Sequence, residues 1–186
     1  MTRAPLRAAS LIALLAIALA TACKGPRVAH PLTNEVRYTC CNIHYEKTEI
    51  TDVNYQRGTL IPFGTRVQIL EVRRNSVKFQ PVGHPPITAV LKYARRTLTI
   101  DDYMNRLFVS EDPHTKLRRA PAKTVKNIEQ GAIEPGMTRE QVLMALGYPP
   151  AHRTPSVDSP TWTYWDNRWT TFDVYFDGDK VSRVSH

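Results

Sequence analysis

The chain has 186 residues, with 25 Lys and Arg against 17 Asp and Glu and a formal net charge of +8. Its three cysteines are too few for a disulfide scaffold in a domain of this size. This excess of basic residues indicates nucleic acid or an anionic surface as the partner. An equally good interpretation is that the charges only solvate a mildly basic surface. No block of like charge is longer than the pairs Arg73-Arg74, Arg95-Arg96 and Arg118-Arg119.

Residues 1–22 are typical of a signal that is removed after export. Arg3 and Arg7 give a positive start, residues 8–20 form an uncharged apolar run, and small residues lead into Cys23. The apolar run is shorter than the roughly 20 residues that a membrane-spanning helix needs. We therefore predict a secretory signal peptide over residues 1–22.

The stretch from Leu19 to Cys23 resembles a lipobox, the processing signal of bacterial lipoproteins, with Ala20 where leucine is usual. The resemblance implies that Cys23 carries a diacylglycerol thioether and an acylated amine, and several acyl chains give stable anchoring. The alternative is an ordinary secretory signal that leaves Cys23 as a free thiol. Lys24 follows, where inner-membrane lipoproteins often carry aspartate, so the sorting pattern favours the outer membrane.

Removal of the signal takes two arginines and no acid, so 25 basic residues become 23 against 17 acids and the net charge falls from +8 to +6. Outside the cytoplasm nucleic acid is not expected as a partner. Anionic lipid headgroups, lipopolysaccharide or an acidic protein fit this charge better.

Residues 23–35 read as a lipidated tether, and residues 36–111 as a first module of short strands. Residues 54–67 resemble the Leu/Ile-Pro-x-Gly-Thr-x-Val segment of SH3-like bacterial modules, through Pro62, Gly64 and Val67. The resemblance implies a small SH3-like β-barrel. The expected elements are strands at 36–40, 65–72 and 87–90, a hairpin over 65–80, and a helix over 100–108 that follows Thr99 and has Asp101 and Asp102 in its first turn.

Cys40 and Cys41 are adjacent within the first expected strand. Neighbouring side chains on a strand point to opposite faces, which favours one buried thiol and one exposed thiol. The alternatives are a vicinal disulfide or a disulfide between two chains. A thiol nucleophile with His44 as its base is disfavoured, because the spacing within a strand makes that pairing a coincidence.

Residues 112–124 are polar, basic and proline-containing, and we read them as a linker in which Thr124 caps the following helix. The second module, 125–186, begins with a short helix interrupted near Gly131. A second helix starts at Thr138, which forms a capping box with Gln141, and Gly147 ends it. Its expected core stripe is Val142, Leu143 and Leu146. Strands at 161–166, 170–176 and 180–184 complete the module, with a hairpin turn at 177–179.

The second module resembles the SmpA/OmlA (BamE) family of small outer-membrane lipoproteins. The resemblance implies a two-helix, three-stranded antiparallel fold and a part in the assembly of outer-membrane β-barrel proteins. The matching residues are Gly136, Met137, Thr138, Gln141, Val142, Leu146, Gly147, Pro149, Trp162, Tyr164, Phe176, Gly178 and Val181. Most of them are cap, core and turn residues, so they identify a fold better than a function.

No motif for catalysis, metal or cofactor binding stands out, so we expect no enzyme, no metal and no cofactor. The histidines are scattered and none has metal-ligand spacing to another His or Cys; they are His30, His44, His84, His114, His152 and His186.

Aromatic residues on and near the strand expected at 170–176 suggest a binding surface. Alternation along this strand puts Phe172, Val174 and Phe176 on the core face. Trp165, Trp169 and Tyr175 fall on the other face, where they would form a partner-binding patch. The alternative is that the first module covers them as a second core.

Taken together, the sequence predicts an α+β, non-enzymatic lipoprotein, anchored through Cys23 to the periplasmic face of the outer membrane of a Gram-negative cell. Its expected partners are envelope proteins, with no nucleic acid and no small-molecule ligand. The alternatives are a cell-wall or glycan binding module, based on the SH3-like resemblance and the charge, and an inhibitor of an envelope enzyme, based on fold analogy.

Overall fold

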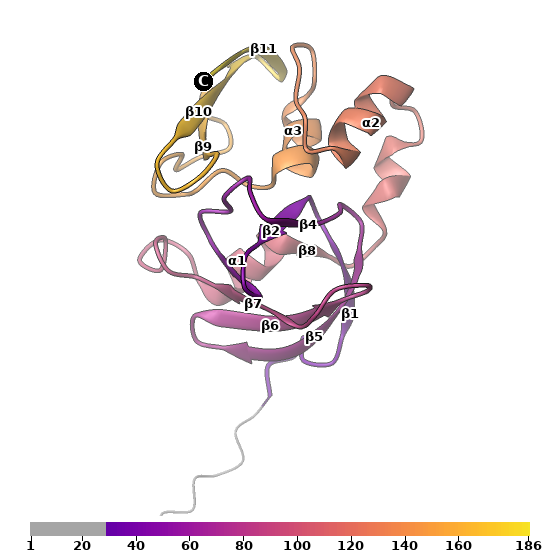
Figure 1. Cartoon of the computed structure of the whole chain (residues 1–186), viewed down its shortest axis with the longest axis vertical. Coiled ribbons are helices and arrows are strands. Elements are labelled where there is room, and N and C mark those ends of the chain that lie inside the picture. Colours follow the sequence, from indigo (N-terminus) through magenta and orange to yellow (C-terminus); the bar gives the residue numbers. More distant parts are fainter. Residues whose placement is uncertain (1–28) are drawn as a thin grey trace, which may run out of the picture.

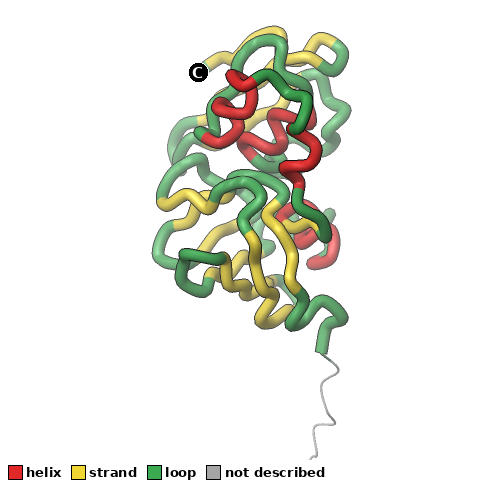
Figure 2. The backbone as a smooth tube through the Cα atoms, turned by 90° about the vertical axis from the view of Figure 1, so that its right-hand side faces the viewer, coloured by secondary structure: helices red, strands yellow, loops and turns green. Residues whose placement is uncertain are grey.

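Two modules stack along the long axis of the molecule, each around its own hydrophobic core (Figures 1 and 2). The computed structural model describes residues 29–186, so the predicted signal peptide and Cys23 lie outside the described residues. The mixed α+β class is confirmed. None of the helices between residues 29 and 186 is long and apolar enough to cross a membrane.

The first module is built on a six-stranded sheet with the order β3-β7-β6-β5-β1-β8. All pairs are antiparallel except β3 with β7. The strands are β1 (Val36–Thr39), β3 (Glu49–Thr51), β5 (Arg66–Arg73), β6 (Ser76–Pro81), β7 (Ile87–Val90) and β8 (Phe108–Val109). A separate ladder pairs β2 (Ile43–Tyr45) with β4 (Thr59–Ile61). The strands expected near 36, 65 and 87 are present, whereas the SH3-like barrel is not confirmed.

The hairpin of β5 and β6 follows from alternating polarity. Val67 and Ile69 on β5 and Val77 and Phe79 on β6 are all buried, while their neighbours face outward. Gly64 makes the turn before β5 at φ +72°, and its backbone N–H donates to the Thr39 carbonyl (3.0 Å).

Helix α1 (Ile100–Leu107) packs across this sheet and begins at the expected cap. The Thr99 hydroxyl accepts from the Asp102 backbone N–H (3.1 Å), and the Asp102 carboxylate accepts from the Thr99 backbone N–H (2.9 Å). The Thr99 hydroxyl also donates to the Asp102 carboxylate (2.7 Å), and this bond, together with the bond from the Thr99 backbone N–H, lowers the pKa of Asp102. Asp101 and Asp102 therefore lie in the first turn of a helix, as predicted.

Part of the predicted tether is folded onto the first module. The Asn34 backbone N–H donates to the Ile69 carbonyl (2.7 Å), and Leu32 packs against the first core. His30 lies 2.7 Å from the Asp101 carboxylate at the start of α1. The tether boundary at residue 35 was therefore placed too late.

The predicted linker, 112–124, is also structured. It contains a 3₁₀ helix, η1 (Pro113–Leu117), and the first turn of α2 (Ala122–Glu129). Leu117 is buried in the second core, which explains why a polar segment stays ordered. Thr124 does not cap α2, because Pro121 occupies the N-cap position and no side chain bonds there.

The second module follows the predicted order of two helices and an antiparallel meander. It comprises α2, α3 (Arg139–Leu146), β9 (Thr161–Trp165), β10 (Thr171–Asp177) and β11 (Lys180–Ser185), in the sheet order β11-β10-β9. The predicted capping box of α3 is present, with Gln141 as its third residue. Phe172, Val174 and Phe176 face the core together with Trp162 and Tyr164.

The predicted apolar stripe of α3 is only partly right. Val142 and Leu146 are buried, and Leu143 is partly buried against the second core. Met144 and Ala145 are buried as well, because α3 also packs against the first module. An amphipathic stripe predicts one covered face, and this helix has two.

Candidate functional site

The two modules are held together by polar side chains that reach the ends of helices. Buried Asn42 donates through Nδ2 to the carbonyls of Ile128 (2.6 Å) and Ala145 (3.0 Å). Its Oδ1 accepts from the Phe63 backbone N–H (2.8 Å). The last carbonyls of a helix lack partners within the helix, and here the first module supplies them.

Two further side chains satisfy the end of α3. Asn54 Nδ2 (2.8 Å) and Gln56 Nε2 (3.0 Å) both donate to the Leu146 carbonyl. Gly147 follows at φ +78°, and a Cβ there would lie 2.7 Å from Asn54 Nδ2. Only glycine allows so close an approach, which fixes the loop of residues 52–58 against the second module.

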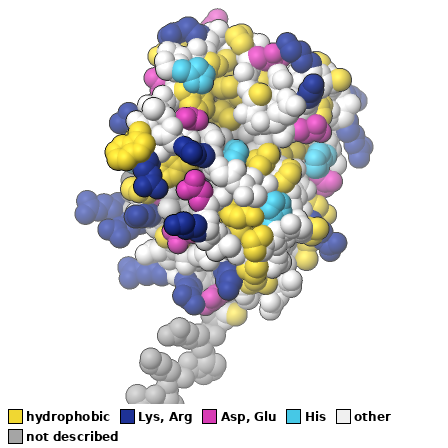
Figure 3. All heavy atoms as spheres, viewed as in Figure 1, with side chains coloured by type: hydrophobic (Ala, Val, Ile, Leu, Met, Phe, Trp, Pro, Cys, Tyr) yellow, Lys and Arg dark blue, Asp and Glu magenta, His cyan; other side chains and the backbone are white. Residues whose placement is uncertain are grey.

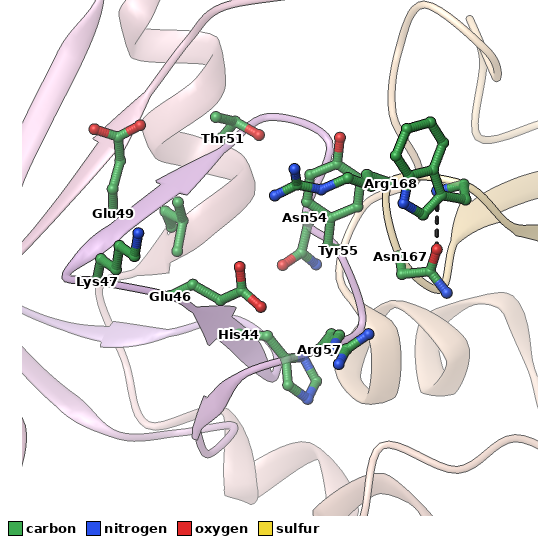
Figure 4. Close-up of a pocket in the computed structure, with 12 residues that line it drawn as sticks. His44, Glu46, Lys47, Glu49, Thr51, Asn54, Tyr55, Arg57, Asn167 and Arg168 are labelled. Carbon is green, nitrogen blue, oxygen red and sulfur yellow. Dashed lines mark hydrogen bonds between the residues drawn. The ribbon is translucent and has the colours of Figure 1, made fainter.

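A groove of about 600 Å³ opens beside this junction (Figure 4). The segment from β2 to Arg57 forms one side, and the loop between β9 and β10 forms the other. It is lined by His44, Glu46, Lys47, Glu49, Ile50, Thr51, Asn54, Tyr55, Arg57, Asn167, Arg168 and Trp169. Each module supplies residues, so the groove exists only when the two are packed together.

Charged side chains surround the groove without pairing. Glu46, Lys47, Glu49, Arg57 and Arg168 are all exposed. Within residues 29–186, none of the five takes part in an ion pair. Their charges therefore remain available to an incoming molecule.

Two lining residues also carry buried polar atoms that lack a hydrogen-bond partner among the described residues. They are Nδ1 of His44 and Oδ1 of Asn54. Burial lowers the pKa of His44, so the imidazole is neutral at neutral pH. Because these two atoms have almost no solvent-accessible surface, a molecule in the groove would reach them only if the side chains turned.

Trp169 lines the groove and is 84% exposed. It lies in the loop between β9 and β10, so its predicted place on the strand was wrong. The Asn167 side-chain oxygen accepts from the Trp169 backbone N–H (2.8 Å) and orders this loop. The indole thus stands on a fixed loop with most of its surface in water.

The other two residues of the predicted patch lie elsewhere. Trp165 is half-buried, with its ring edge-on to Tyr55 of the first module at 6.4 Å. The Gln56 backbone N–H donates to the Trp165 carbonyl (3.0 Å). Tyr175 is half-buried beneath the Arg183 guanidinium, 3.8 Å from its ring centre.

The three residues do not form one ring cluster, and their partner-binding role stays a prediction. No ring contact joins any two of Trp165, Trp169 and Tyr175 in the described part of the chain. Alternation along a strand cannot predict how a following loop turns. Trp165 fits the alternative that the first module covers these residues. Trp169 is exposed, as a partner-binding residue would be.

The sequence did not reveal the groove residues of the first module, such as Tyr55 and Arg57. They lie in a loop with no motif, more than 100 positions from Trp169.

On the face shown in Figure 3, Lys and Arg side chains gather along the flank that carries the β9–β10 loop in Figure 1. Among residues 29–186, no cluster of His, Cys, Asp or Glu could hold a metal ion.

Comparison with known proteins identifies the second module. Residues 123–186 match the family model of the outer membrane protein assembly factor BamE domain, which confirms the resemblance predicted for residues 125–186. No curated protein and no solved structure matches the chain. The SH3-like resemblance of the first module thus remains a prediction.

Proposed function

We propose that this chain, which carries a BamE domain over residues 123–186, is a non-catalytic lipoprotein that binds protein partners during the assembly of outer-membrane proteins. The groove between the two modules is the proposed binding site, and Trp169 is its anchor. The observation that supports this site is the position of the Trp169 indole, which is 84% exposed on an ordered loop that lines the groove.

The lining of the groove favours a protein over a small molecule. Small-molecule pockets are mostly apolar, with a few polar groups. Here five exposed charged side chains surround the groove, as in the polar rim of a protein interface, and tryptophan is among the commonest interface anchors. Binding of a protein segment would cover the indole and bring polar groups of the partner next to the exposed charges of the groove.

The position of the N-terminal end supports a membrane anchor on Cys23. The described chain begins at the end of the first module that lies opposite the BamE domain (Figure 1). A lipid on Cys23 would therefore hold the first module next to the membrane. The BamE domain and the groove would then face the periplasm.

Site-specific photo-crosslinking in living cells tests this function. A photoreactive phenylalanine analogue at position 169 should crosslink to subunits of the machinery that inserts β-barrel proteins. The same analogue at position 82 is the control, because Val82 is 68% exposed but does not line the groove. Equal crosslinking from both positions, or crosslinking from position 169 only to cell-wall hydrolases, would contradict the proposal. Sedimentation of the protein with purified peptidoglycan would instead support the glycan-binding alternative.

A further inference from the structure

The two adjacent cysteines do not point to opposite faces, as a strand would require. Strand β1 ends at Thr39, and the backbone bends at Cys40 and Cys41. The bend brings the two Sγ atoms to 2.8 Å from each other. The Cys40 Sγ also lies 2.8 Å from the Arg106 carbonyl oxygen, as a hydrogen-bond donor.

Only one of the two thiols can be reached from solvent. Cys40 is partly exposed and lines a pocket of about 300 Å³ on the seam between the modules, whereas Cys41 is 1% exposed. The apolar lining of this pocket includes Leu143, Met144 and Tyr148, and the ion-paired Lys116 and Glu140 (2.7 Å) also line it. A reagent in the pocket meets Cys40, with Cys41 directly behind it.

From this geometry we infer that Cys40 and Cys41 form a redox-active dithiol that closes to a vicinal disulfide by exchange with a small disulfide such as oxidised glutathione. The Cys40 thiolate attacks one sulfur of the glutathione disulfide, forming a mixed disulfide and releasing one glutathione thiolate. The Cys41 thiolate then attacks Sγ of Cys40 and displaces the second glutathione. The two protons from the cysteines go to the two glutathione thiolates, so two protein thiols are oxidised and one disulfide is reduced.

The second step needs little movement. A disulfide bond is about 2.05 Å long, so the sulfur atoms must approach by roughly 0.8 Å. Burial and the neighbouring thiol raise the pKa of Cys40, so the thiolate fraction is small and the first step is slow.

The resulting disulfide is a reversible modification and stabilises the folded chain very little. A ring closed by two adjacent residues restrains the unfolded chain very little. Neighbouring Cα atoms are about 3.8 Å apart, less than the usual separation of about 4.4–6.8 Å in disulfides, and strained disulfides are the labile ones.

Peptide mass spectrometry of the full-length chain tests the inference independently of Cys23. Trypsin cuts after Arg37 and Lys47, so one peptide, residues 38–47, contains both Cys40 and Cys41. After treatment with oxidised glutathione and alkylation of the denatured protein, this peptide should carry no alkyl group and be two hydrogens lighter than the dithiol form. Recovery of two alkylated thiols, a stable glutathione adduct, or two such peptides linked to each other would overturn the inference.

Single variants test the order of the two steps. Cys41→Ser should retain one glutathione on Cys40, because no thiol remains to displace it. Cys40→Ser should take up glutathione at least tenfold more slowly, because Cys41 is buried. The reverse pattern would contradict the assigned roles, and the wild-type peptide decides the inference even if a variant fails to fold.

Discussion

The side-chain amide of Asn42 donates to the carbonyl oxygen of Ala145, 103 positions further along the chain, at 3.0 Å. The same nitrogen donates to the Ile128 carbonyl at 2.6 Å, so one side chain closes the ends of both α2 and α3. Asn42 is fully buried. The first module thus supplies donors to the helix ends of the second.

We expect Asn42→Ala to lower the free energy of unfolding by about 1–3 kcal/mol or more, because it leaves buried carbonyls without donors. Asn42→Asp should cost more, since it places a carboxylate oxygen against two carbonyl oxygens. Urea unfolding of both variants measures this. Asn75→Ala, at the exposed turn between β5 and β6, is the control and should change stability by less than about 0.5 kcal/mol. If Asn42→Ala unfolds like the parent, the junction is not held by this side chain.

Local features were predictable from the sequence, and the junction was not. The capping box of Thr138 and Gln141 and the turn at Gly147 each depend on residues a few positions apart, so their patterns are visible in the sequence. Asn42 has no such pattern, because its partners are 86 and 103 positions away. The groove was missed for the same reason, since two unrelated loops form it.

Helix α3 should depend on its cap and on its last core residue. Thr138→Ala removes a side chain that accepts from the Gln141 backbone N–H, and we expect a loss of about 0.5–2 kcal/mol. Leu146→Ala, at a position 3% exposed, should cost about 2–5 kcal/mol. Denaturant melts give both values. A silent Leu146→Ala would mean that the second core does not include this side chain.

His44 should make the protein less stable in mild acid. Burial lowers its pKa below the ordinary 6.5, so the unfolded chain binds the proton first as the pH falls. The free energy of unfolding should therefore decrease as the pH drops through about 6.5, and this decrease should stop below the lowered pKa of the folded state. His44→Gln should remove that part of the pH dependence in urea titrations between about pH 7.5 and 5. Parallel curves for parent and variant would show that His44 is not held neutral by the fold.

Cys23→Ser tests the proposed anchor. Serine cannot form the thioether to diacylglycerol, so the variant should take up no labelled palmitate and should leave the membrane fraction or remain unprocessed. Cys40→Ser is the matched control, because it removes a thiol without touching the lipobox. If Cys23→Ser still incorporates palmitate and sediments with membranes, Cys23 is not the lipidated residue.

Paired measurement of thermal stability and partner capture in Trp169→Ala tests the central claim most directly, that the groove between the modules binds a protein partner. Because the indole is 84% exposed, its removal should change stability by less than about 0.5 kcal/mol. Capture of β-barrel assembly subunits should weaken by about 1–2 kcal/mol or more, roughly five- to thirtyfold in Kd. Val82→Ala should change neither quantity, and Trp165→Ala should lower stability because its ring packs against Tyr55. Unchanged capture by Trp169→Ala, with or without a lower melting temperature, would contradict the account and place the binding surface elsewhere on the molecule.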